Sequence, residues 1–118
     1  MDITITGVDA VKGLSLHRGD EDRYFIVLRT FVDDVPETLN KLRNITSENL
    51  PGYATAISGI KETSKAIGAD DLSQSALDLE TLARAGDFAG VQAGNGAFIT
   101  QAETLIKEVR AWLNRNRG

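Results

Sequence analysis

Three chemically active side chains lie within four positions of each other in the middle of the chain: Ser58, Lys61 and Glu62. A serine hydroxyl becomes a nucleophile only where a neighbouring base takes its proton. The single histidine, His17, is far from this stretch in the sequence. Glu62 lies one helical turn from Ser58, but we expect it to face solvent. The stretch therefore lacks the base that serine chemistry requires.

Other catalytic chemistries also lack their residues. The sequence has no cysteine, which excludes disulfides, thiolate metal sites and cysteine nucleophiles. His17 lies in the connection 16–20 without further candidate ligands nearby, so we interpret it as an exposed loop histidine rather than a metal ligand or phosphate acceptor. No Ser/His/acid set and no phosphate-cradling glycine motif is present. We predict a protein that is not an enzyme and needs no metal or cofactor.

The spacing of apolar residues predicts the helices that carry Ser58, Lys61 and Glu62. After an extended lead-in over residues 1–6, apolar side chains recur at helical spacing from about Val8 onward. Capping and stop signals predict helices at about 9–16, 21–43, 51–67, 70–85 and 87 to the end. Four substantial helices with short connections predict an all-α, antiparallel up-down-up-down four-helix bundle with a short extra N-terminal helix. We expect residues 1–118 to form a single domain.

Two features complicate the helical pattern. Pro36 lies inside the second predicted helix, where a proline removes a backbone donor, so we expect a kink or a local break. Gly90, Gly94 and Gly96 lie near the start of the last helix, and each lowers helix propensity by about 1 kcal/mol relative to alanine. These glycines indicate either close helix packing or partial fraying.

The third predicted helix has two distinct faces at 100 degrees per residue. Its apolar face should point into the bundle and comprises Tyr53, Ile57, Ile60, Ser64 and Ile67. An adjoining, more polar flank comprises Ala54, Ser58, Lys61 and Lys65. A reactive residue at position 58 would be reachable by a partner while the core held its helix in place. Without further signals, Lys61 and Lys65 would be a solvated face.

The stretch from Ala56 to Leu72 resembles the signature of histidine phosphotransfer (HPt) domains. In that signature a lysine follows the acceptor histidine at the third position, a small residue at the fourth, and the glycine of an Ile-Gly-Ala turn at the tenth. Counting back from Gly68 places Ser58 at the acceptor position, with Lys61 as the lysine and Glu62 in place of the small residue. The resemblance spans nearly the whole chain, and it is strongest to HPt domains attached to bacterial hybrid sensor kinases and response regulators.

The resemblance implies a phosphorelay module, in which a histidine takes a phosphoryl group from a receiver aspartate and passes it on. A phosphoserine ester would be too stable for onward transfer, and Glu62 would repel an incoming phosphoryl group. We therefore expect a receiver-docking or inactive adaptor module. Its expected partners are a response-regulator receiver domain and a hybrid sensor kinase, and its expected partner surface comprises Ala54, Ser58, Lys61, Glu62 and Lys65.

Two other interpretations remain open. The chain could be a bundle engineered from an active HPt parent, or a purely structural helical interaction domain. In the second case Trp112 and the glycines of the last helix would supply contacts, although ordinary core packing also accounts for Trp112. The sequence leaves the oligomeric state open.

The net negative charge of the chain argues against nucleic acid as a partner. The formal net charge is −4 and the pI about 4.9, which opposes nucleic-acid binding because that requires a concentrated cationic surface. Arg110, Arg115 and Arg117 are a local exception, which we interpret as favourable charge at a helix C-terminus. No apolar run approaches the ~20 residues of a membrane span. The N-terminus lacks the basic and apolar regions of a secretory signal, so we expect a cytoplasmic protein.

Overall fold

Aspartates begin three of the helices, as their positions in the sequence predict. A computed structural model describes residues 3–116; Met1, Asp2, Arg117 and Gly118 lie outside the described residues, and with them parts of the predicted lead-in and arginine tail. Asp9, Asp20 and Asp87 each accept a hydrogen bond from a backbone N–H of the first helical turn, at 2.9–3.2 Å. The helices are α1 (Ala10–Leu16), α2 (Glu21–Leu42), α3 (Leu50–Ile67), α4 (Asp70–Arg84) and α5 (Phe88–Arg115), with a short 3-10 helix at Ser47–Asn49.

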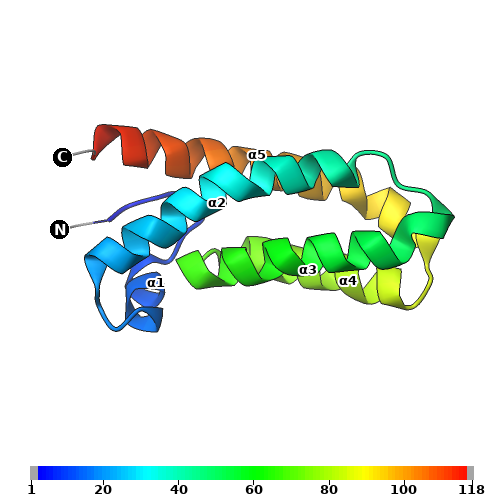
Figure 1. Cartoon of the computed structure of the whole chain (residues 1–118), viewed down its shortest axis with the longest axis horizontal. Helices are drawn as coiled ribbons and strands as arrows, with labels where there is room; N and C mark the ends of the chain where they lie inside the picture. The colour runs from blue at the N-terminus through cyan, green and yellow to red at the C-terminus, as the bar shows by residue number, and fades with distance from the viewer. Residues whose placement is uncertain (1–2, 117–118) are drawn as a thin grey trace.

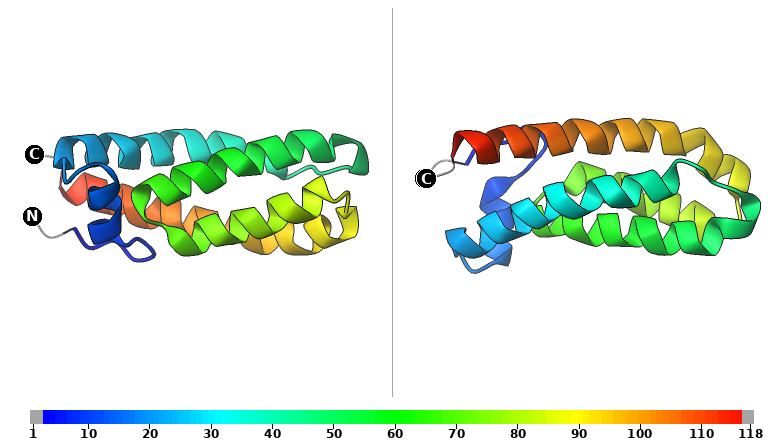
Figure 2. Two further views of the ribbon diagram at one scale, coloured as in Figure 1. Left: turned by 90° about the horizontal axis from the view of Figure 1, so that it is seen from below. Right: turned by 45° about the horizontal axis from the view of Figure 1, so that its top comes forward.

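The four long helices run alternately in opposite directions (Figure 1). The view from below shows α3 and α4 side by side, and α1 crosses one end of the bundle (Figure 2). The start of the described chain and the C-terminal end of α5 lie at the same end (Figure 1). The predicted all-α, antiparallel four-helix bundle with a short N-terminal helix is confirmed. No helix within residues 3–116 has the length and apolar character needed to cross a bilayer.

Helix α2 continues through Pro36, so of the expected kink or local break the break does not occur. Pro36 has no N–H to offer the carbonyl of Val32 one turn earlier. The guanidinium of Arg110 on α5 donates to this carbonyl instead, at 3.3 Å. Arg110 therefore forms a hydrogen bond to the backbone of α2. The sequence alone had indicated only that its charge is favourable near the C-terminus of a helix.

The glycine-rich start of α5 is helical rather than frayed. A Cβ atom built on Gly94 would lie 3.1 Å from Leu79 Cδ2 on α4, whereas Gly96 faces open space. Close packing therefore explains Gly94. Trp112 is only 4% exposed and its ring centre lies 5.5 Å from that of Phe25, so this side chain belongs to the core rather than to an interaction surface.

A buried polar network joins three helices. The Tyr53 hydroxyl donates to Asn95 Oδ1 at 2.9 Å, and Asn95 Nδ2 donates to the carbonyl of Leu42 at 2.8 Å. Burial raises the pKa of Tyr53 to about 12, so its hydroxyl remains a donor at neutral pH. The network satisfies a carbonyl in the last turn of α2 and ties the start of α3 to α5.

Helix α1 is held against the C-terminal end of α3. The N–H of Asp9, the residue that caps α1, donates to the carbonyl of Gly68 at 2.9 Å, and the hydroxyl of Tyr24 on α2, whose ring lies next to Gly13 of α1, donates to the carbonyl of Ile67 at 2.7 Å. A Cβ atom on Gly13 would lie 2.6 Å from the Tyr24 ring and 2.7 Å from the Ile67 oxygen. Only a glycine permits so close an approach of α1. Gly68 itself has φ of 85°, the left-handed conformation that ends α3.

Candidate functional site

Ser58 lies in the middle of α3, partly exposed, at the border between the buried face of the helix and its solvent side. The predicted buried face is confirmed: each of its five residues is between 0% and 5% exposed, namely Tyr53, Ile57, Ile60, Ser64 and Ile67. This apolar face fixes the rotation of α3 in the bundle. The core therefore holds Ser58 at a defined place on the surface, as the helical pattern indicated.

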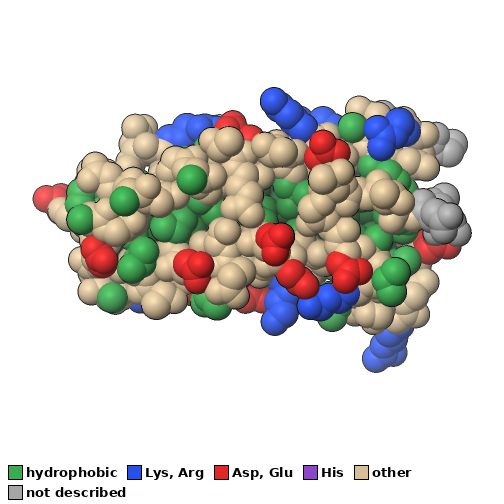
Figure 3. All heavy atoms as spheres, turned by 180° about the vertical axis from the view of Figure 1, so that it is seen from behind, with side chains coloured by type: hydrophobic (Ala, Val, Ile, Leu, Met, Phe, Trp, Pro, Cys, Tyr) green, Lys and Arg blue, Asp and Glu red, His purple; other side chains and the backbone are tan. Residues whose placement is uncertain are grey.

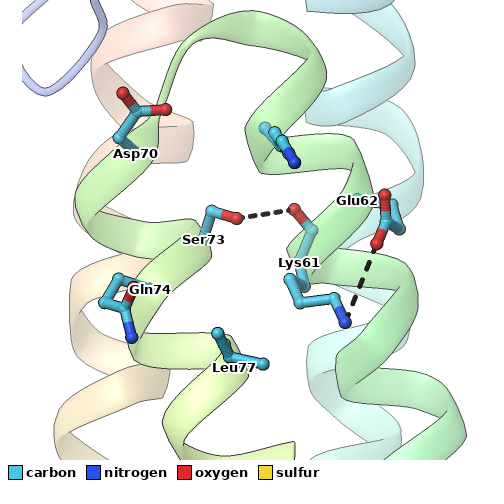
Figure 4. A pocket seen from close by; sticks show the side chains of 7 residues that line it. Lys61, Glu62, Asp70, Ser73, Gln74 and Leu77 are labelled. Atoms are coloured by element: carbon cyan, nitrogen blue, oxygen red, sulfur yellow. Dashed lines mark hydrogen bonds and ion pairs between the residues drawn. The ribbon is translucent and has the colours of Figure 1, made fainter.

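The flank of α3 that carries Ser58 borders α4 rather than open solvent. The Ser73 hydroxyl of α4 donates to the carbonyl of Lys61 at 3.1 Å (Figure 4). Ala54, which we expected on the partner surface, is only 1% exposed. That expectation is wrong, because a small side chain on this flank is covered where neighbouring helices pack. Ala54 belongs to the core and cannot contact a partner directly.

Lys61 is held by a carboxylate of α4. Its Nζ lies 2.6 Å from Glu80 Oε1, and the side chain is 21% exposed. The hydrogen bond from Lys61 lowers the pKa of Glu80, and the same hydrogen bond raises the pKa of Lys61. Lys61 is therefore not a freely solvated cation, as its sequence pattern alone would suggest. At neutral pH its charge is already paired.

Glu80 is the centre of this charge cluster, and sequence reasoning did not identify it as part of the site. Its side chain is 9% exposed, and its second oxygen, Oε2, lies 2.9 Å from a guanidinium nitrogen of Arg84. The spacing of Glu80 and Arg84 along one helix is a visible signal for an ion pair. The contact with Lys61 links residues 19 positions apart, and no sequence pattern specifies it.

Glu62 and Lys65 complete the polar surface beside Ser58. The Glu62 side chain is 69% exposed, as predicted, and its Oε1 lies 3.7 Å from Lys61 Nζ (Figure 4). Lys61, Glu62 and Lys65 line one wall of a groove of about 350 Å³ between α3 and α4. The opposite wall consists of α4 side chains: Asp70, Ser73, Gln74 and Leu77. Leu77 is 40% exposed and forms an apolar spot in an otherwise polar groove.

Ser58 has no activating base in this arrangement. Within residues 3–116 its hydroxyl makes no hydrogen bond, and the buried carboxylate of this face, Glu80, is engaged by two cations. A lowered pKa also makes Glu80 a weaker base. The geometry supports a binding surface rather than serine nucleophilic chemistry.

His17 lies at the end of the bundle, away from this face. Its Nε2 is 3.0 Å from the carbonyl of Ala66, and its ring centre is 6.2 Å from that of Tyr24. The expectation of an exposed loop histidine is wrong: His17 is partly buried, because α1 folds back onto the end of α3. Ala66 lies eight residues beyond Ser58, which corresponds to about 12 Å along the helix axis. The structure does not bring His17 to Ser58.

The described residues also offer no alternative metal centre. Within residues 3–116 no cluster of three or more His, Cys, Asp or Glu side chains could hold an ion. The face seen in Figure 3 carries acidic and basic side chains beside one another, without a continuous basic surface. The polar cluster and the groove between α3 and α4 make this face, beside Ser58, the candidate functional site.

Comparison with known proteins agrees with this arrangement. The family model described as Hpt domain matches residues 26–112, which include α3, α4 and most of α2 and α5. No curated protein and no solved structure gives a significant match. Hpt domains are helical bundles that carry phosphoryl groups and interact with receiver domains and kinases in phosphorelays; they are not classical enzymes. The match covers well over half of the chain, and the chain therefore belongs to the Hpt domain family.

Proposed function

We propose that this chain is a phosphorelay module that docks receiver domains but does not carry the phosphoryl group itself. Residues 1–118 act as one module in this proposal, and the docking surface is the α3–α4 face with Ser58, Lys61, Glu62 and Lys65. The partners are a response-regulator receiver domain and, through it, a hybrid sensor kinase of the bacterial type. Membership of the Hpt domain family supports the phosphorelay setting.

The observation that carries the proposal is the position of the single histidine. His17 is partly buried against Ala66 at the end of α3, whereas position 58, in the middle of α3, is a serine. In this proposal position 58 is the acceptor position of the family signature, so the docking surface offers no histidine to accept a phosphoryl group. A serine there would need a base, and its phosphate ester would be a poor donor for onward transfer.

The charges around Ser58 also oppose phosphoryl transfer. Glu62 is exposed beside Lys61, and both Glu62 and Glu80 lie within ion-pair distance of the Lys61 ammonium group. An incoming phosphoryl group would meet carboxylates near the acceptor position and a cation that is already paired. A docking role does not require the transfer step and is compatible with these charges.

Phosphotransfer from phosphorylated receiver domains tests the proposal. The proteins to compare are the wild-type chain, Ser58→His, and Ser58→His combined with Glu62→Gly; Glu62→Gly alone controls for the added flexibility. We expect receiver binding by all four proteins and labelling of the histidine variants only, with more label in the double variant. Labelling of the wild-type chain would disprove the missing acceptor. Failure of every protein to bind any receiver, with the fold intact, would disprove the docking function.

A further inference from the structure

We propose that Glu80 is an internal competitor for Lys61, and that it sets how strongly the α3–α4 face binds an acidic partner. This inference rests on the proposed docking function and adds a regulatory contact to it. In the free protein Lys61 is committed to Glu80; in the docked state Lys61 turns outward to a carboxylate or phosphoryl oxygen of the receiver. The exchange involves no covalent step.

The first argument is that the cation is already satisfied without a partner. Lys61 Nζ lies 2.6 Å from Glu80 Oε1 and 3.7 Å from Glu62 Oε1, so two carboxylates share one ammonium group. Glu80 is 9% exposed, which leaves its charge little access to water. A partner that needs Lys61 must therefore draw it away from a buried carboxylate, and part of the docking energy offsets that loss.

The second argument is that the cluster contains a replacement cation. Arg84 binds the other oxygen of Glu80, with its Nη2 at 2.9 Å from Oε2, and its own side chain is 58% exposed. When Lys61 leaves, Glu80 keeps one cation and does not become an isolated buried charge, which would be far more costly. Arg84 thus makes the departure of Lys61 possible.

The third argument is that the outward path is open. Lys61 lines the groove between α3 and α4, together with Lys65 and the partly exposed Leu77 (Figure 4). The long, flexible lysine stem can reach into this groove without moving either helix. A receiver domain supplies the complementary charge, because the phosphorylated aspartate of its active site is anionic.

Four variants test the exchange: Glu80→Gln and Arg84→Met should have opposite effects on receiver binding, and Lys61→Gln is made with and without Glu80→Gln. Glu80→Gln removes the competing charge, and we expect a Kd for the receiver that is about 3–10-fold lower. Arg84→Met removes the replacement cation but keeps an apolar stem, and we expect a Kd about 3-fold higher. In a Lys61→Gln background, Glu80→Gln should leave the Kd unchanged. Calorimetric titration with a panel of purified receiver domains, each bound to Mg²⁺ and fluoroberyllate, measures these constants, with thermal melts as the check on folding.

A second measurement separates this inference from the docking function. NMR titration of the Lys61 amine in the free proteins should show a lower pKa in Glu80→Gln than in wild type, because the hydrogen-bonding carboxylate is gone. An unchanged Lys61 pKa overturns the inference, whatever the receiver does. A lowered pKa with equal receiver affinities overturns the competition but leaves docking intact. No binding by any variant, including Glu80→Gln with its freed lysine, overturns docking and the inference together.

Discussion

The C-terminal end of α3 and its centre are built in different ways. At the end, α1 approaches so closely that a Cβ atom on Gly13 would clash with the Tyr24 ring and the Ile67 carbonyl, and the buried Tyr24 hydroxyl of α2 donates a hydrogen bond to that carbonyl. At the centre, Ser58 is partly exposed and its hydroxyl makes no hydrogen bond to any residue of 3–116. The C-terminal end of α3, where α1 and the start of α2 pack closely against it, is called the joint below. The centre of α3 is instead a partly exposed surface that lies over the hydrophobic core.

This difference explains how the two regions tolerate change. A side chain at the joint has neighbours on every side, so a substitution there must move a helix. A side chain at position 58 can change its chemistry while the buried face of α3 keeps the helix in place. We therefore expect an exchange of the side chain at position 58 to have a small effect on stability. The four predictions below test the contrast, from the largest expected effect to the smallest.

Gly13→Ala should strongly disrupt the joint. The added methyl group would lie 2.6 Å from the Tyr24 ring and 2.7 Å from the Ile67 oxygen, and overpacking of this kind costs about 1–3 kcal/mol. Urea denaturation followed by circular dichroism measures the loss. The matched control is Gly59→Ala at the centre of α3, where a Cβ meets open space; we expect it to stabilise by about 0.5–1 kcal/mol. Equal effects at both glycines would contradict the contrast.

Tyr24→Phe should destabilise the joint by removing one hydrogen bond. The hydroxyl donates to the Ile67 carbonyl at 2.7 Å in a buried setting, and an unsatisfied buried acceptor costs about 1–2 kcal/mol. Burial raises the pKa of Tyr24 to about 12, so the donor is present throughout the neutral range. Hydrogen exchange of amides at the start of α2 and in the last turn of α3 should accelerate together with the drop in the unfolding midpoint. A midpoint equal to that of wild type would show that α2 holds the end of α3 without this bond.

The Lys61–Glu80 pair at the centre should give a smaller, pH-dependent contribution. The pKa of Glu80 is lowered in the folded state, so its contribution is present above the usual glutamate value of 4.5 and is lost as the pH falls through the lowered value. Glu80→Gln should therefore have a lower urea midpoint than wild type at pH 7, and this difference should shrink at acidic pH below 4.5. A difference that stays constant between these pH values would exclude a charge effect.

Ser58→His should have almost no effect on stability. The side chain at position 58 lies at the surface and can extend a larger ring toward solvent, so we expect a change in unfolding free energy within about 0.5 kcal/mol. Parallel urea denaturation of wild type and variant measures it. A loss comparable to that of Gly13→Ala would mean that the centre of α3 is as tightly packed as its end.

The sequence by itself determined the helices, their limits and the rotation of α3. Aspartates at positions 9, 20 and 87 mark helix starts, and Gly68 and Gly86 mark helix ends, because capping depends only on residues within one turn. The buried stripe of α3 follows from helical spacing in the same local way. These signals were enough to predict the bundle and to place Ser58 at the border of its buried face.

Only the tertiary structure decided what the residues of α3 contact. It buried Ala54, paired Lys61 with Glu80, brought His17 to the Ala66 carbonyl and directed Arg110 to the carbonyl that Pro36 leaves free. Each of these features brings together parts of the chain that are distant in the sequence, and its existence depends on how far the helices approach and turn toward one another. Helical periodicity reports which face of a helix is apolar, but it carries no information about the neighbour that covers the border of that face.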